Sequence, residues 1–103
     1  MTAYIVFTRI RTRNPAELKL YAEQAPVFMA GYTVKRHANF GPCEALEGPE
    51  VEGVAILEFA SLEAARAWYG SPAYQGASRH RDLGGDYSAV LVEGLADATG
   101  AAS

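Results

Sequence analysis

The sequence is poor in the residue types that build metal, disulfide and phosphate sites. Its single cysteine, Cys43, has no partner for an internal disulfide, so we expect a reducing, cytoplasmic setting. Only two histidines are present, and neither stands at a ligand spacing from other metal-binding residues, so we expect no metal or other cofactor. The pair Gly84-Gly85 follows a predicted helix instead of opening one, and no Gly-x-Ser-x-Gly pattern occurs. Nucleotide and hydrolase sites of these types are therefore not indicated.

Positive charge and long hydrophobic runs are also scarce. Lysine and arginine total 9 against 12 aspartates and glutamates, which gives a net charge of −3. Such a chain has no general attraction to phosphate backbones or anionic lipid, so we expect no nucleic-acid and no membrane partner. The apolar run over residues 3–7 is far shorter than the roughly 20 residues of a membrane-spanning helix.

The composition that is present is that of an ordinary globular domain, with 50% hydrophobic and 20% charged residues over 103 positions. A chain of this length buries about two-thirds of its unfolded surface around one core. We therefore expect a single domain over residues 1–95. Residues 96–103 are small or polar, and we expect a flexible C-terminal tail there.

Strands are predicted where β-branched and aromatic residues gather between turn residues. The expected strands are residues 4–10, 54–59 and 87–93, with a short edge strand over 43–47 after the Gly41-Pro42 pair. Cys43 would then be a small strand residue. A nucleophilic role for this thiol would require a base held beside it.

Helices are predicted from capping residues and from a 3.6-residue apolar period. The first begins at Asn14 and is expected to kink or restart at Pro26. The others cover residues 62–69 and 73–81, each after a serine that can cap it. The order strand, helix, strand, strand, helix, strand predicts a ferredoxin-like α+β domain with a split β-α-β pattern. Its four-stranded antiparallel sheet would carry the helices on one face.

Three of these strands have apolar side chains on both faces, for example Val6 against Phe7 and Ile56 against Leu57. Helices on one side leave the second face bare. Exposing roughly five such side chains would forfeit about 1.5–3 kcal/mol each, which is comparable to the whole stability of a small domain, about 5–15 kcal/mol. We therefore expect a homodimer that packs through the sheet face.

The middle of the chain also carries a motif. Residues 58–75 read EFASLEAARAWYGSPAYQ and resemble the signature of family 1330 of the domains of unknown function, a family of small bacterial proteins. Further parts of the resemblance are Phe40-Gly41, residues 44–48, Asp86-Tyr87 and residues 92–94. It spans about residues 3–95.

Membership in this family implies the dimeric α+β barrel superfamily, in which two ferredoxin-like sheets face each other. Relatives in that superfamily include cofactor-independent monooxygenases, lactone isomerases, haem enzymes and ligand-sensing domains, so the resemblance implies a fold and no single chemistry. His37 and Asn39 fall in a segment for which it implies no role.

Two histidines, His80 and His37, are the candidate catalytic bases. His80 is the stronger candidate because Arg81 and two aspartates surround it in an expected loop near Tyr74. The alternative is that both histidines are solvated or bonded for structural reasons.

A cleft between the sheet and the helices is the candidate ligand site. Arg9 lies on an otherwise apolar strand, so it either pairs with an acid such as Glu58 or anchors the carboxylate of a ligand. Arg81 is a further ligand-binding candidate. The aromatic residues expected to line the cleft are Tyr4, Phe40, Trp68, Tyr74 and Tyr87. The same aromatics would also suit a plain hydrophobic core.

Three functional hypotheses remain open. The leading one is a dimeric protein that binds a small, partly apolar or carboxylate-bearing molecule in the cleft. The second is a cofactor-independent enzyme, monooxygenase-like or isomerase-like, with a histidine base and Arg9 as the anion anchor. The third is a purely structural or assembly role.

Overall fold

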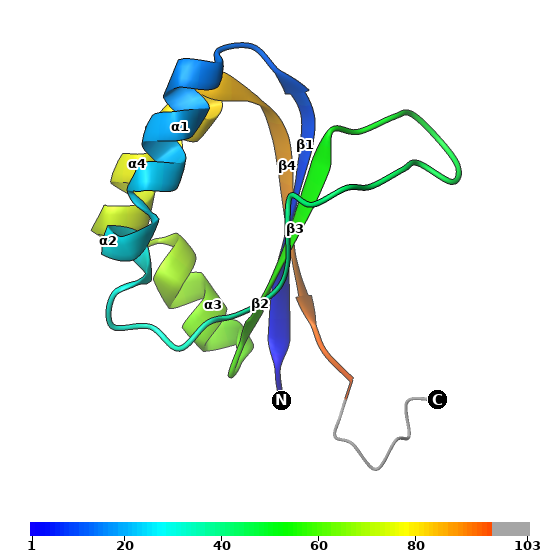
Figure 1. The fold of residues 1–103 in the computed structure, drawn as a ribbon. Helices are drawn as coiled ribbons and strands as arrows, with labels where there is room; N and C mark the ends of the chain where they lie inside the picture. The colour runs from blue at the N-terminus through cyan, green and yellow to red at the C-terminus, as the bar shows by residue number, and fades with distance from the viewer. Residues whose placement is uncertain (96–103) are drawn as a thin grey trace.

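The computed structural model in Figure 1 describes residues 1–95, and the tail predicted for residues 96–103 lies outside the described part. The chain forms four strands and four helices, and they follow one another along the sequence in the predicted order. Their bounds are β1 Ala3–Thr12, α1 Pro15–Glu23, α2 Ala25–Met29, β2 Lys35–Asn39, β3 Gly53–Phe59, α3 Leu62–Tyr69, α4 Pro72–Gly84 and β4 Gly85–Glu93.

The four strands form one antiparallel sheet in the order β2-β3-β1-β4. All four helices lie on one face of this sheet (Figure 1). The predicted ferredoxin-like α+β fold, with helices on one face of a four-stranded antiparallel sheet, is therefore confirmed. Within residues 1–95, none of the helices has the length and apolar character needed to cross a membrane.

Capping residues start the helices as the sequence predicts. The side chain of Asn14 accepts a hydrogen bond from the backbone N–H of Ala16 at 3.2 Å and caps α1. Ser61 and Ser71 cap α3 and α4 in the same manner. Pro26 stands in the first turn of α2, so the predicted restart of the first helical segment is confirmed.

The second strand lies elsewhere than expected. The prediction of an edge strand over residues 43–47 is wrong, because β2 covers Lys35–Asn39 and residues 43–47 lie in the loop that joins β2 to β3. The β2 segment is polar, and a bulge between Arg36 and Ala38 interrupts its alternation, so the sequence pattern gave no strand signal. Cys43 is accordingly an exposed loop residue.

The face of the sheet toward the helices, here called the inner face, forms the core. Alternate residues of β1 and β3 are buried on it. Trp68 and Tyr74 are fully buried, and their ring centroids lie 4.2 Å apart. The indole N–H of Trp68 donates to the carbonyl oxygen of Phe28 at 2.9 Å, which ties α3 to α2.

The opposite face, here called the outer face, is largely apolar and is covered by none of the helices of residues 1–95 (Figure 1). At its centre Val6 stands between Ile56 and Val90. The side chains of Val90 and Val92 are 56% and 48% exposed. The outer-face residues of β1, β3 and β4 are Tyr4, Val6, Thr8, Val54, Ile56, Glu58, Ser88, Val90 and Val92. The expected two-sided apolar pattern is therefore present.

Candidate functional site

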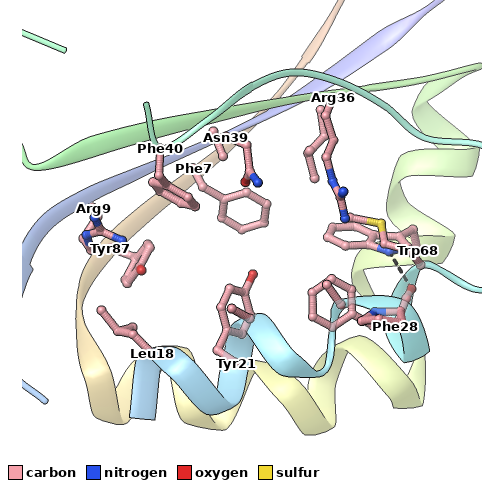
Figure 2. A pocket seen from close by; sticks show the side chains of 16 residues that line it. Phe7, Arg9, Leu18, Tyr21, Phe28, Arg36, Asn39, Phe40, Trp68 and Tyr87 are labelled. Carbon is pink, nitrogen blue, oxygen red and sulfur yellow. Dashed lines mark hydrogen bonds between the residues drawn. The ribbon is translucent and has the colours of Figure 1, made fainter. Parts of the chain in front are cut away.

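A cavity of about 580 Å³ lies between the inner face of the sheet and helices α1 and α2. Its walls are mainly apolar and aromatic (Figure 2). They include Phe7 and Leu57 from the sheet, Tyr21 from α1, Phe28 from α2 and Trp68 from α3. The volume falls in the roughly 300–1,000 Å³ range of small-molecule sites.

An apolar stripe along α1 and the first residue of α2 faces this cavity instead of a filled core. Leu18, Tyr21, Ala22 and Ala25 recur at helical spacing, and all four line the cavity. None of the residues of α1 is buried, although the helix lies over the sheet. The sequence pattern therefore placed this face correctly, but the space in front of it is open.

Two arginines lie at opposite ends of the cavity (Figure 2). At one end the guanidinium carbon of Arg9 is 4.9 Å from the ring centroid of Phe40, and its Nε donates to Glu52 Oε1 at 3.2 Å. At the other end Arg36 is exposed and has no ion-pair partner among residues 1–95. The cavity therefore meets one paired and one unpaired cation.

The ionic partner of Arg9 differs from the expected one. Glu58 lies on the outer face, where its Oε1 is 2.6 Å from Nε2 of His37, whereas Arg9 lies on the inner face. Glu52, at the end of the β2–β3 loop, takes its place. Hydrogen bonds from Thr12, together with the positive charge of Arg9, hold the pKa of the Glu52 carboxyl below its usual value.

Neither candidate histidine lines the cavity. His37 lies beside Tyr4 on the outer face, with ring centroids 5.9 Å apart. His80 lies on α4, inside the part of the helix predicted over residues 73–81, and not in a loop. Its Nδ1 is 3.2 Å from Glu17 Oε2 of α1. The structure thus keeps the two histidines on separate surfaces.

Three of the five aromatics expected in the cleft line it: Phe40, Trp68 and Tyr87. The rings of Phe40 and Tyr87 meet edge to face, 6.1 Å apart at 89°. Tyr74 is fully buried behind the cavity wall, and Tyr4 lies on the outer face. Alternation along β1 explains the position of Tyr4, since Tyr4 and the buried residues at positions 3 and 5 point to opposite faces.

A hydrogen-bonded chain runs from the cavity wall into the core. The hydroxyl of Tyr21 is 2.8 Å from the hydroxyl of Tyr74, to which Arg81 Nη1 donates at 3.0 Å. Arg81 Nη2 also donates to Asp82 Oδ1 at 3.1 Å, and the guanidinium carbon is 5.5 Å from the ring centroid of Phe7. Burial raises the pKa of Tyr21 to about 12. Arg81 and Tyr74 therefore lie behind the wall and reach the cavity through Tyr21.

Three polar residues of the cavity, Arg36, Asn39 and Tyr21, were not among the predicted site residues. The first two line the cavity from β2, the strand that the sequence pattern placed elsewhere. Tyr21 falls on the 3.6-residue apolar period of the first predicted helix, which suits its ring but carries no information about its hydroxyl. Plain alternation along β2 would put residues 36 and 39 on opposite faces. The bulge between Arg36 and Ala38 brings both to the inner face, opposite Leu57 and Ala55, and the sequence carries no signal for it.

Only a few types of polar side chain line the cavity. None of the lining residues is a carboxylate, an imidazole or a thiol; the polar side chains are arginine, tyrosine and asparagine. Within residues 1–95, no group of three or more His, Cys, Asp and Glu side chains is arranged to hold a metal ion.

A family model described as Domain of unknown function (DUF1330) matches residues 2–95. The chain belongs to this family. The resemblance noted in the sequence is thereby confirmed. No protein of curated function matches this DUF1330 chain.

Solved structures share the fold of this DUF1330 protein at low sequence identity. The RPA0582 protein of unknown function from Rhodopseudomonas palustris has a TM-score of 0.68 at 18% identity, over 93% of this chain and 84% of its own. SnoaB, a cofactor-independent oxygenase from Streptomyces nogalater, has a TM-score of 0.65 at 13% identity, over 93% and 95%. A dimeric protein of unknown function and ferredoxin-like fold from Bacteroides fragilis NCTC 9343 has a TM-score of 0.62 at 12% identity, over 90% and 96%.

Proposed function

We propose that this DUF1330 protein is a homodimer in which each subunit binds a small, partly apolar molecule with an anionic oxygen group, such as a carboxylate, in the sheet–helix cavity. The observation that carries the proposal is the make-up of the cavity. Its walls are apolar and aromatic, arginines lie at both ends, and none of its lining residues is acidic (Figure 2). Such a site favours an apolar body with a negatively charged end.

The open face of α1 supports a ligand at this position. Leu18 and Ala22 face the cavity, and a ligand would remove their apolar surface from water at a gain of about 25 cal/mol per Å². Arg36 supports an anion, because a guanidinium without an ionic partner binds a carboxylate through two parallel hydrogen bonds.

The outer face supports the homodimer. It carries a row of partly exposed apolar side chains, and a two-fold axis would let a second copy bury the same face of both subunits. We propose a second copy of the chain as the occupant, because two such apolar faces can pack against each other. The carboxylate of Glu58 on this face already pairs with His37, so it would not be left without a partner. A Bacteroides fragilis protein of the same fold is dimeric, which supports the expectation of a dimer.

A cofactor-independent enzyme is the second candidate, since SnoaB shares the fold and is an oxygenase of that kind. A histidine base would have to contact the ligand. Because His37 and His80 lie outside the cavity of their own subunit, the geometry favours binding over a histidine-catalysed reaction. A purely structural role would leave the cavity unused.

Calorimetric titration with 1-naphthoate tests the binding proposal. We expect one saturable site per chain, and at least about tenfold weaker binding in Ala22→Phe, whose ring would occupy the cavity. Ala16→Phe is the matched control, because Ala16 is an exposed position of α1 that does not line the cavity. Arg36→Gln should weaken binding of 1-naphthoate but not of its neutral analogue 1-naphthalenemethanol.

Two results would contradict the binding proposal. One is a wild-type protein that gives no saturable heat with either naphthyl compound. The other is an Ala22→Phe variant that binds 1-naphthoate as tightly as the wild type and the Ala16→Phe control do.

A further inference from the structure

The hydroxyl pair of Tyr21 and Tyr74 has a definite donor direction. The distance of 2.8 Å is a hydrogen bond in which either oxygen could hold the shared proton. A guanidinium has donors and no acceptor, so Arg81 must donate to the oxygen of Tyr74 and cannot accept the tyrosine proton.

Burial decides which hydroxyl donates. Tyr74 is 0% exposed, and among residues 1–95 the hydroxyl of Tyr21 is the one acceptor within hydrogen-bonding distance of its hydroxyl. If Tyr21 donated instead, the O–H of Tyr74 would be buried without an acceptor, which is unfavourable. Tyr74 therefore donates to Tyr21, and the proton of Tyr21 remains free to point away from this pair.

The free proton of Tyr21 faces the cavity. Tyr21 lines it, and its hydroxyl points from α1 toward Phe7 across the open space (Figure 2). The cation of Arg81 stands behind this chain and polarises both hydroxyls in the direction that strengthens donation by Tyr21. Because burial raises the pKa of Tyr21 to about 12, the hydroxyl also keeps its proton at neutral and mildly alkaline pH.

We infer that Tyr21 donates a hydrogen bond to an oxygen of the bound ligand, with the direction of donation set by Arg81 through Tyr74. This inference rests on the proposed binding function and narrows its ligand class. The hydroxyl of Tyr21 lies between the two arginine-bearing ends of the cavity, beside the aromatic walls (Figure 2). An oxygen at that position must be attached directly to the flat apolar body of the ligand, as in a phenolate or an enolate.

Binding of 4-nitrophenolate and of nitrobenzene tests this inference, because the two probes differ only in the phenolate oxygen. The titrations are made with the full chain at a pH at which the probe is ionised and Tyr21 is not. Tyr21→Phe should weaken 4-nitrophenolate binding by about tenfold or more and leave nitrobenzene binding unchanged. Tyr32→Phe is the matched control, since Tyr32 is exposed and lies outside the cavity.

A second substitution keeps the test independent of any folding defect in Tyr21→Phe. Replacement of Tyr21 by 3-fluorotyrosine retains the ring and makes the hydroxyl a stronger donor, so 4-nitrophenolate should bind more tightly while nitrobenzene does not.

The possible outcomes distinguish a failure of the role inferred for Tyr21 from a failure of the proposed binding function. If both probes bind and neither substitution changes the selectivity for 4-nitrophenolate, the role of Tyr21 is wrong and the binding function stands. An equal loss of both probes in Tyr21→Phe would mean that the residue only packs, which also overturns the inference. If the wild type binds 1-naphthoate but not 4-nitrophenolate, the inference is overturned and the binding function stands; if it binds none of these probes, the binding function itself fails.

Discussion

Val6→Asp is the most severe single test of the proposed dimer. Val6 stands at the centre of the outer face, between Ile56 and Val90. In a two-fold dimer only the part of each Val6 side chain that is still exposed in one subunit becomes buried, so its loss costs at most about half of the 1.5–3 kcal/mol of a full burial, or up to about 1.5–3 kcal/mol per dimer. That loss alone raises the dissociation constant of the dimer by up to about 10- to 100-fold. Two carboxylates buried without partners add several kcal/mol more.

Sedimentation equilibrium over a range of concentrations measures this effect. The wild type should sediment at twice the 11.0 kDa mass of the chain, and Val6→Asp as a folded single chain, because Val6 is only half-buried within one subunit. Val27→Asp is the control, since Val27 is 58% exposed on α2, away from the outer face. A wild type of single-chain mass, or a Val6→Asp variant that associates like the wild type, would refute the argument.

Two further substitutions test the packing and the ion pairs around α1 and α4. Gly84→Ala should lower the free energy of unfolding by about 1–3 kcal/mol in thermal melts, because the new Cβ would lie 2.5 Å from Leu18 Cδ2; an unchanged melting temperature would contradict the close packing. Hydrogen bonds from Arg13 and a neighbouring arginine lower the pKa of Asp86 below its usual 3.8. The stabilisation of the folded state by the ionised Asp86 is therefore fully present above pH 3.8 and is lost as the pH falls through the lowered pKa. Asp86→Asn should thus be less stable than the wild type at neutral pH, with a difference that shrinks in acid; a difference independent of pH would contradict this.

The fold could be predicted from the sequence because its main signals are local. Asn14 and Ser61 start helices where the pattern places them, and both faces of β1 and β3 alternate as apolar rows. These signals act within a few residues of chain, so they do not depend on knowledge of the tertiary contacts.

The edge strand β2 could not be predicted in the same way. Its residues Lys35–Asn39 are polar, since an edge strand presents much of its surface to solvent, and a bulge breaks their period. The more apolar and turn-bounded segment at Cys43 therefore looked like the better strand. Two cavity residues, Arg36 and Asn39, were missed as a consequence.

The chemistry of the cavity depends on pairings between distant parts of the chain, which no local pattern reveals. Arg9 pairs with Glu52, and Arg81 reaches the cavity through Tyr74 and Tyr21, across separations of 43, 7 and 53 residues. The sequence therefore indicated three of the six aromatic residues that line the cavity, Phe40, Trp68 and Tyr87, but not the hydrogen-bonded chain behind them.

A crystal structure of the protein with 1-naphthoate measures the central claim most directly, because it locates the ligand. We expect the naphthyl ring between α1 and the inner face of the sheet, against Phe7 and Trp68, with the carboxylate toward Arg9 or Arg36. A naphthoate bound only on the outer face of the sheet, or a cavity filled by rearranged side chains of the protein itself, would contradict it.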